Sequence, residues 1–266
     1  ASCTKIPYLV VNLPATELKE GCYSHMFSQC VSLGSLFLYS LPATKLVNYC
    51  YDGMFSGCDH IYETFPLPAV DLAPYCYRSM FSGCKSLRTT PFLHAQQMEK
   101  SCYANMFQDC TQLDSVFVLP SNKLSDSCYQ KMFANCTNLK KFPPLPAVEM
   151  KPSCYDSMFS GCVSLVEAPE LPATELVQQC YRNMFEGCSS LNYIKVGVLT
   201  LENDFDATTN WVKGVDGPGL FIFPCGSKYN KHGDSEVPMD FDIISSPIVI
   251  FQNPDGNELW RDTIAC

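Results

Sequence analysis

Cysteine is the residue type in this chain whose number and spacing could do chemistry, because thiols bind metals and form disulfides. The sequence contains 17 cysteines, and 14 of them delimit segments like CYSHMFSQC, with Tyr, Met and Phe at fixed places between two cysteines. The segments begin at Cys22, Cys50, Cys76, Cys102, Cys128, Cys154 and Cys180. The first step is 28 residues and the later steps are 26 residues each. A fixed period of this length predicts a solenoid of stacked repeats.

A structural zinc site and a disulfide within one segment are both disfavoured. Zinc sites are built from close pairs such as Cys-x-x-Cys, often with histidine partners. The chain has no Cys-x-x-Cys, and its four histidines are scattered at His25, His60, His94 and His232. If a segment is helical, its two cysteine Cα atoms lie about 12 Å apart, whereas a disulfide requires about 4.4–6.8 Å.

Disulfides between neighbouring repeats are harder to dismiss, because adjacent strands lie about 4.8 Å apart. Seven equivalent cysteines in one column cannot all pair, however, and pairing would make the repeats unequal. We therefore expect two columns of buried free thiols, in which Cys packs as a small hydrophobic side chain. Cys3, Cys225 and Cys266 lie outside the pattern and are the better candidates for a disulfide.

The elements that position these cysteines can be read from one repeat. In the segment 102–110 the Cys, Tyr, Met, Phe and Cys fall at i, i+1, i+4, i+5 and i+8, an arc of about 140° on a helix. This spacing predicts a short helix with one buried face. Ser101, Ser127 and Ser153 precede the first cysteine and could cap its start. The residue before the second cysteine is Gly, Asn, Asp or Gln, and we expect a left-handed helix end there.

The remainder of each repeat is predicted to be a short strand followed by a corner. A Leu or Ile stands three residues after the second cysteine, and Leu-Pro-Ala or a close variant follows in most repeats. Prolines such as Pro91, Pro143 and Pro169 allow only a short or irregular strand. The predicted fold class is therefore an α/β solenoid, with short parallel strands on one face and short helices on the other.

At this point the residues resemble a known family. The pattern CYxxMFxGCxSL followed by LPA resembles the BspA-type leucine-rich repeat surface proteins, in the Cys-rich variant of Bacteroides-like bacteria. The segment 210–215, with Gly219, Phe221 and Pro224 after it, resembles the region that closes the C-terminal end of such proteins. Together the likeness covers roughly residues 12–240. It implies a leucine-rich-repeat solenoid with a C-terminal cap, a secreted or outer-membrane-exposed location, a role in adhesion, and no catalytic residues.

The domain organisation expected from this resemblance has three parts. Residues 1–200 form the leucine-rich-repeat solenoid of about seven repeats with a short N-terminal cap. Residues 201–240 form the C-terminal capping region. Residues 241–266 are a β-hairpin-like tail, or the start of a truncated further domain.

Composition limits the partners. The net charge is −9, and the 18 Lys and Arg residues are scattered, so no basic patch favours nucleic acid or an anionic membrane surface. No apolar run approaches the roughly 20 residues that span a bilayer. Ala1-Ser2-Cys3 is compatible with a lipid anchor at or upstream of Cys3, which stays an alternative. We expect a monomer.

Ligand-binding candidates are the two positions after the repeat Leu, which we expect to be exposed on the strands. They vary between repeats while the frame stays constant, as in other solenoid binding surfaces. Their mixed charge favours a protein or glycan ligand on a host or neighbouring cell. The candidate residues are Tyr62, Glu63, Arg88, Asp114, Lys140, Lys141, Glu167, Asn192 and Tyr193.

Other functions are retained as alternatives or set aside. The chain could be a rigid structural spacer within a larger surface protein, or a phage or secretion-system surface component. No nucleophile motif or phosphate-binding loop is found, so we expect no catalytic residue, no enzyme activity and no cofactor. The acid pairs Asp204 with Asp206 and Asp240 with Asp242 could hold calcium, but we expect them to be solvated, and we expect no metal.

Overall fold

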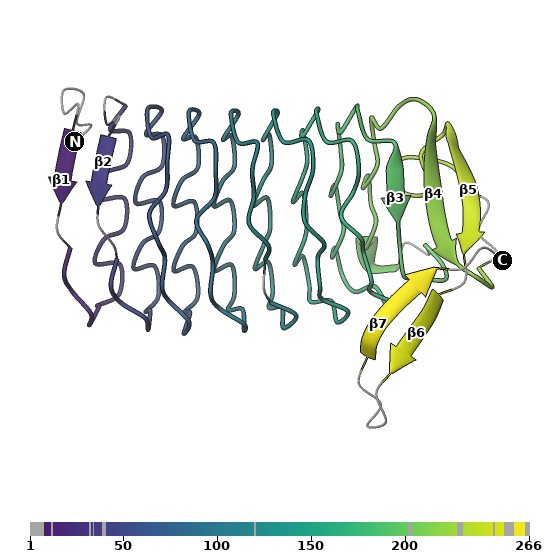
Figure 1. Ribbon diagram of the computed structural model, residues 1–266, viewed down its shortest axis with the longest axis horizontal. Coiled ribbons are helices and arrows are strands. Elements are labelled where there is room, and N and C mark those ends of the chain that lie inside the picture. The colour runs from purple at the N-terminus through teal and green to yellow at the C-terminus, as the bar shows by residue number, and fades with distance from the viewer. Residues whose placement is uncertain are drawn as a thin grey trace.

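The computed structural model shows coils stacked side by side along one long axis (Figure 1). It describes residues 8–11, 13–31, 33, 35–38, 41–119, 121–201, 204–227, 231–246, 248–252 and 258–263. The stacking confirms the predicted solenoid. Each coil contacts the coil before and after it, so the core is a continuous strip rather than a central cluster.

One face of the solenoid carries short parallel strands at its two ends. β1 (Tyr8–Val11) pairs with β2 (Ser35–Leu38), and β3 (Tyr193–Lys195), β4 (Gly219–Pro224) and β5 (Phe241–Ser246) form a second parallel sheet in that order. Between them the strand line is reduced to single parallel bridges, such as Leu67 to Leu93 and Thr89 to Ser115. Prolines in this line remove the N–H groups that a continuous ladder requires.

β6 (Ile248–Gln252) and β7 (Glu258–Thr263) pair as an antiparallel hairpin after the last solenoid strand. The β3-β4-β5 sheet runs from Tyr193 to Ser246. The division of the chain at residues 200 and 240 stays a prediction.

The predicted helices are wrong. Among the residues that the structure describes, the only helical element is the short 3-10 turn η1 (Asp204–Asp206). Each cysteine segment is instead a series of overlapping four-residue turns. In the segment 102–110 the N–H groups of residues 102, 104, 106, 108 and 110 donate to the carbonyl three residues earlier, at 3.2 Å in each case.

The intervening N–H groups bond to the next coil. Those of Tyr103, Asn105, Phe107 and Asp109 donate to carbonyls 25 residues ahead, at 2.8–3.0 Å. Alternate amides therefore close turns and join coils, so that the buried backbone is satisfied without a helix.

The turns require a left-handed residue at every fourth position. Ser101, Asn105 and Asp109 have φ of 50°, 56° and 61°, and each is the third residue of a turn, a place where positive φ is common. The buried types at i, i+1, i+4, i+5 and i+8 thus follow a period of four. That period also fits one face of a helix, which is why the sequence pattern was compatible with both. The serines expected to cap helices are instead left-handed, whereas the left-handed position before the second cysteine is confirmed.

Gly83 offers a test of this backbone. It has φ of +73°, and a Cβ there would lie 3.5 Å from the Gly57 Cα, which is ordinary contact. Gly83→Val is expected to lower the free energy of unfolding by about 1–2 kcal/mol, because a branched side chain is strained in the left-handed region. Gly83→Asn should cost less, since Asn135 holds φ of 61° at the equivalent place. Urea unfolding of the two variants checks this, and equal effects would contradict it.

The core consists of columns of identical side chains. Successive Phe rings from Phe27 to Phe185 stack with centroids 5.5–6.0 Å apart. Successive Tyr rings from Tyr23 to Tyr181 stack at 5.6–6.2 Å. The Met and both Cys columns lie in the same buried cluster. Every inner coil therefore buries the same set of side chains between two copies of itself.

The C-terminal end is closed by one further coil, whose turn segment at residues 204–214 lacks the two repeat cysteines. The N–H groups of Tyr181 and Phe185 donate to the carbonyls of Ala207 and Trp211 at 2.9 and 2.7 Å, as in earlier coils. The Trp211 ring stacks on Tyr181 with centroids 6.2 Å apart, and its Nε1 donates to the Glu236 carbonyl at 2.7 Å. A large indole thus covers the end of the aromatic columns.

Candidate binding surface

The structure places the predicted binding residues in two adjacent columns on the strand line. The Arg88 N–H donates to the Tyr62 carbonyl at 3.3 Å, and the Asp114 N–H donates to the Arg88 carbonyl at 3.1 Å. Further along, the Asn192 N–H donates to the Val166 carbonyl at 2.9 Å. The candidate side chains are exposed except Tyr193, which is half-buried. Candidate residues of successive repeats therefore lie on adjacent coils.

Tyr62, Glu63 and Arg88 are the candidates that lie around a common depression. Thr64 and Thr89 complete its lining. The depression combines an aromatic ring, a carboxylate, a guanidinium and two hydroxyl groups, which suits hydrogen bonding to a polar ligand. Lys140, Lys141 and Glu167 stand on later coils and do not share it.

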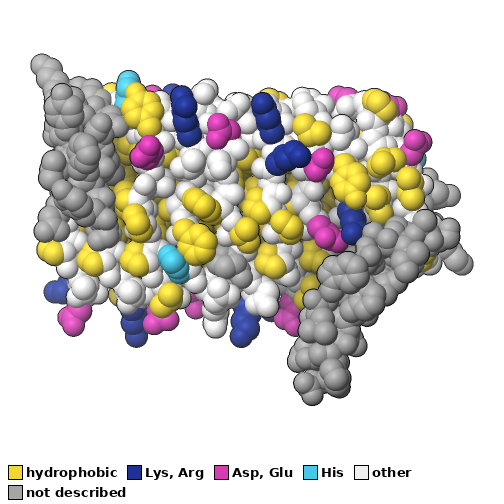
Figure 2. Space-filling view, viewed as in Figure 1, with side chains coloured by type: hydrophobic (Ala, Val, Ile, Leu, Met, Phe, Trp, Pro, Cys, Tyr) yellow, Lys and Arg dark blue, Asp and Glu magenta, His cyan; other side chains and the backbone are white. Residues whose placement is uncertain are grey.

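An apolar part of this surface was not predicted from the sequence. Phe92, Phe117 and Val118 are 50%, 52% and 55% exposed. The Phe92 ring lies 6.0 Å from Phe117 and 4.8 Å from His94, edge to face in both cases. Hydrophobic side chains run across the middle of the face in view (Figure 2). The sequence did contain a signal for this apolar surface. The residue before the Leu of the Leu-Pro-Ala corner is apolar in four successive repeats: Pro66, Phe92, Val118 and Pro144.

The cysteine columns are free thiols, as predicted. All 14 repeat cysteines are free and all are buried except Cys22, which is exposed. From Cys58 to Cys188 the second-column thiols donate to a carbonyl of the preceding coil, for example Cys84 Sγ to Phe55 O at 3.2 Å. Cys225 is disulfide-bonded, whereas Cys3 and Cys266 lie outside the described residues.

Burial also determines the acid–base state of these thiols. It raises the pKa of Cys50, Cys128 and Cys162 to about 12. The thiolate is the form that binds metals and reacts as a nucleophile. The buried columns therefore hold neutral thiols at physiological pH.

Thiol labelling tests this arrangement. Among the repeat cysteines, only Cys22 is expected to react with an aromatic disulfide reagent in the native protein, because the others are inaccessible and protonated. The Cys22→Ser variant should lack that fast-reacting thiol, and guanidinium should release the remaining thiols in both proteins. Rapid native labelling of several further repeat cysteines would contradict the buried columns.

Two buried carboxylates form ion pairs between neighbouring coils. Asp52 accepts hydrogen bonds from Arg78 Nε and Nη2 at 3.0 and 2.7 Å. Asp156 accepts from Arg182, and from Gln130 Nε2 at 2.9 Å. Each carboxylate is paired with an arginine one coil further on, which compensates its desolvation. These pairs occupy the same repeat position and reinforce the stacking register.

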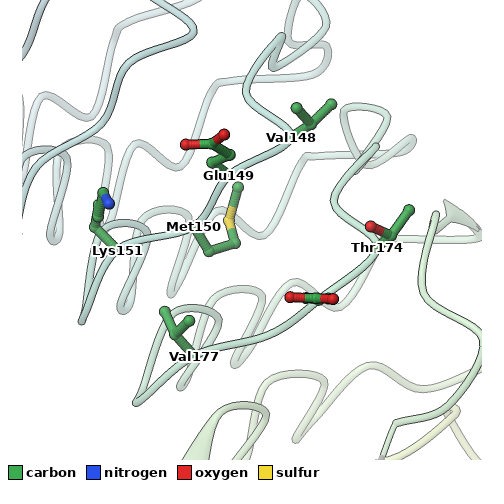
Figure 3. Close-up of a pocket in the computed structure, with 7 residues that line it drawn as sticks. Val148, Glu149, Met150, Lys151, Thr174 and Val177 are labelled. Atoms are coloured by element: carbon green, nitrogen blue, oxygen red, sulfur yellow. The ribbon is translucent and has the colours of Figure 1, made fainter.

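The described residues form one further depression. This second depression is lined by Val148, Glu149, Met150, Lys151, Thr174, Glu175 and Val177, and Figure 3 shows Lys151 and Thr174 at its opposite sides. Within the described part of the chain, no group of three or more His, Cys, Asp or Glu side chains could hold a metal ion. In the same described ranges no helix has the length and hydropathy needed to cross a bilayer.

The comparisons with known proteins agree with the repeat architecture. A family model described as the BspA type leucine rich repeat region matches in six copies, over residues 22–162 and 130–205. No curated protein and no solved structure matches the chain. Since the model covers more than half of the 266 residues, the chain belongs to the BspA-type leucine-rich repeat family.

Proposed function

We propose that this chain is a non-enzymatic extracellular binding or adhesion module, secreted or exposed at the bacterial outer membrane, that engages a protein or glycan partner. Repeats of this family are common in surface adhesion and binding proteins. The observation that carries the proposal is the pair of exposed columns containing Tyr62, Arg88 and Lys140. Variable side chains on a constant frame are how solenoids build recognition surfaces.

The binding residues proposed are those of the two columns. The depression around Tyr62, Glu63 and Arg88 is proposed as the main contact, because a ring and charged groups converge there. Asp114, Lys140, Lys141, Glu167, Asn192 and Tyr193 extend the surface along the solenoid. Their alternating charges suit a partner with both signs of charge rather than a polyanion.

Binding can be tested by screening immobilised host extracellular proteins and glycans against the folded chain. The double variant Tyr62→Ala with Arg88→Ala is expected to weaken any specific partner by about tenfold or more, as for an aromatic and arginine contact. Lys131→Ala with Val163→Ala alters two exposed residues outside the columns and should leave binding unchanged. A partner that ignores the first variant and loses affinity with the second would place recognition elsewhere.

A rigid spacer is the second candidate function. It is favoured by the uninterrupted hydrogen bonds and ring stacking from coil to coil, which resist bending. If the screen finds no partner and a longer natural protein carries another recognition domain, the spacer proposal gains. A phage or secretion-system component is a third possibility that gene neighbourhood would test.

Several finer expectations stay proposals. They are the monomeric state, which light scattering would measure, and the origin in a Bacteroides-like bacterium. A lipid anchor at Cys3 falls on a residue outside the described ranges. The absence of a cofactor is likewise an expectation, which metal analysis of the purified protein would check.

A further inference from the structure

The strongest unexplained feature is an apolar ridge formed by Pro66, Phe92, Val118 and Pro144, with Phe117 beside it. The bridge between Leu67 and Leu93 aligns the first two ridge residues, and the 26-residue step aligns the others. All four are exposed. The Phe92 and Phe117 rings are in contact, with centroids 6.0 Å apart. A contiguous exposed apolar patch is typical of a protein interaction site, and the proposed polar contacts do not explain this one.

We infer that this ridge binds an amphipathic helical segment of a partner protein that carries acidic residues on one flank. The inference rests on the proposed binding function and names the partner class for the same face. Four coils spaced about 4.8 Å apart span about 14 Å, which is close to the length of a ten-residue helix at about 1.5 Å per residue.

The chemistry of the ridge favours an apolar polypeptide surface over a glycan. Pro, Phe and Val side chains have no hydrogen-bonding atoms, whereas the His94 ring, which contacts Phe92 at the edge of the ridge, does. Sugars need directional partners for their hydroxyl groups. The helix stripe i, i+3, i+4, i+7 places neighbouring side chains about 5–6 Å apart, near the coil spacing. Alternate residues of an extended strand lie about 6.6 Å apart and match it less well.

Basic residues beside the ridge indicate that one flank of the bound helix is acidic. Arg88 lies four residues before Phe92, and Lys140 and Lys141 lie four and three residues before Pro144, or about 10–13 Å along an extended chain. Within the described residues none of the three forms an ion pair. Carboxylates on the flank of a bound helix would reach these cations. Exposed Glu63 and Asp114 lie on the same flank, three and four residues before Pro66 and Val118, and disfavour a partner with uniform negative charge.

The test uses a displayed library of helical peptides, with Leu or Phe held along one stripe and Glu, Lys or Ser varied on both flanks. Selection on the chain is expected to enrich Glu on one flank. Phe92→Ser with Phe117→Ser should weaken the selected peptides by about tenfold or more. Phe205→Ser, which alters a 76% exposed Phe in the cap coil, is the matched control and should have no effect.

Charge reversal provides the second arm. In Lys140→Glu with Lys141→Glu, selection should shift from Glu toward Lys on the flank, whereas Lys100→Glu with Lys151→Glu, two exposed lysines elsewhere, should not shift it. No enrichment, or enriched peptides indifferent to Phe92 and Phe117, would overturn the inference. A glycan whose binding depends on Phe92 would also overturn it while leaving the binding function intact. Loss of every partner in the protein and glycan screen would overturn the binding function itself.

Discussion

Raising the pH from about 8 to about 10.5 under reducing conditions is expected to unfold the protein in a steep transition. Burial raises the pKa of 11 repeat thiols, to about 12 for Cys50, Cys128 and Cys162 and to about 11 for Cys180. In the unfolded chain a thiol ionises near its ordinary pKa of about 8.5. Between these values the unfolded state releases protons that the folded state retains.

The sign follows from linkage. Below a pH of about 8.5 both states keep the thiol protons and pH has little effect. Above it, each buried thiol lowers the free energy of unfolding by about 1.4 kcal/mol per pH unit. Eleven such groups together give a slope of about 15 kcal/mol per pH unit, which is comparable to the whole stability of a typical domain. The loss would end only as the pH passes the folded-state values.

Six buried tyrosines add to this alkaline sensitivity at higher pH. Burial raises the pKa of the hydroxyls of Tyr51, Tyr77, Tyr103, Tyr129, Tyr155 and Tyr181. Their unfolded pKa is about 10, so their contribution begins about 1.5 pH units above that of the thiols.

Urea unfolding at a series of pH values measures the effect. Replacing Cys110 by Ala should reduce the slope by about 1.4 kcal/mol per pH unit. Replacing the exposed Cys22 by Ala is the matched control and should leave the slope unchanged. Stability that stays constant between pH values of about 8 and about 10 would show that the thiols are not buried and neutral as the structure has them.

Truncating one ring of the Phe column is expected to produce the largest single-residue loss of stability. Phe107 is fully buried, and its ring centroid lies 5.8 Å from Phe81 and 5.5 Å from Phe133. Phe107→Ala should lower the free energy of unfolding by about 3–5 kcal/mol, because it removes both contacts and leaves a cavity that a repeating frame cannot close. Thermal or urea unfolding measures it.

The neighbouring Tyr column supplies a contrasting variant. The Tyr77 hydroxyl is buried and has no hydrogen-bond partner among the described residues. Tyr77→Phe keeps the ring between Tyr51 and Tyr103, at 5.6 and 5.8 Å, and should be neutral or stabilising by up to about 1 kcal/mol, since an unpaired buried hydroxyl is costly. The core is not built from stacked identical rings if Phe107→Ala melts like the parent protein. The same follows if Tyr77→Phe destabilises the protein as strongly as Phe107→Ala does.

The two effects share one cause. In a central core, a poor contact can be relieved by rearrangement of many different neighbours. In this solenoid each buried side chain meets two copies of itself, so a property such as thiol neutrality or ring size is multiplied along the stack. The constant frame leaves the exposed strand positions free to differ between repeats, which is where the binding proposals are placed.

The sequence alone was enough to predict three features. They are the repeat period, the burial of the Cys, Tyr, Met and Phe columns, and the absence of disulfides between the repeat cysteines. These features follow from composition and spacing, because equivalent residues in a stack must bury equivalent surfaces. The left-handed residue before each second cysteine was also predictable, since Gly, Asn and Asp tolerate that backbone.

The backbone between the cysteines was decided by tertiary structure. Consecutive four-residue turns and a helix both place Cys, Tyr, Met and Phe on one buried face. The sequence pattern could therefore not distinguish the turns from a helix. The choice depends on the coil alongside, whose carbonyls accept every second N–H and make the turns preferable to a helix that would bond only to itself. The ridge of Phe92 and Val118 was hidden for the same reason, because whether an apolar side chain near a proline corner points inward or outward is settled only when neighbouring coils pack.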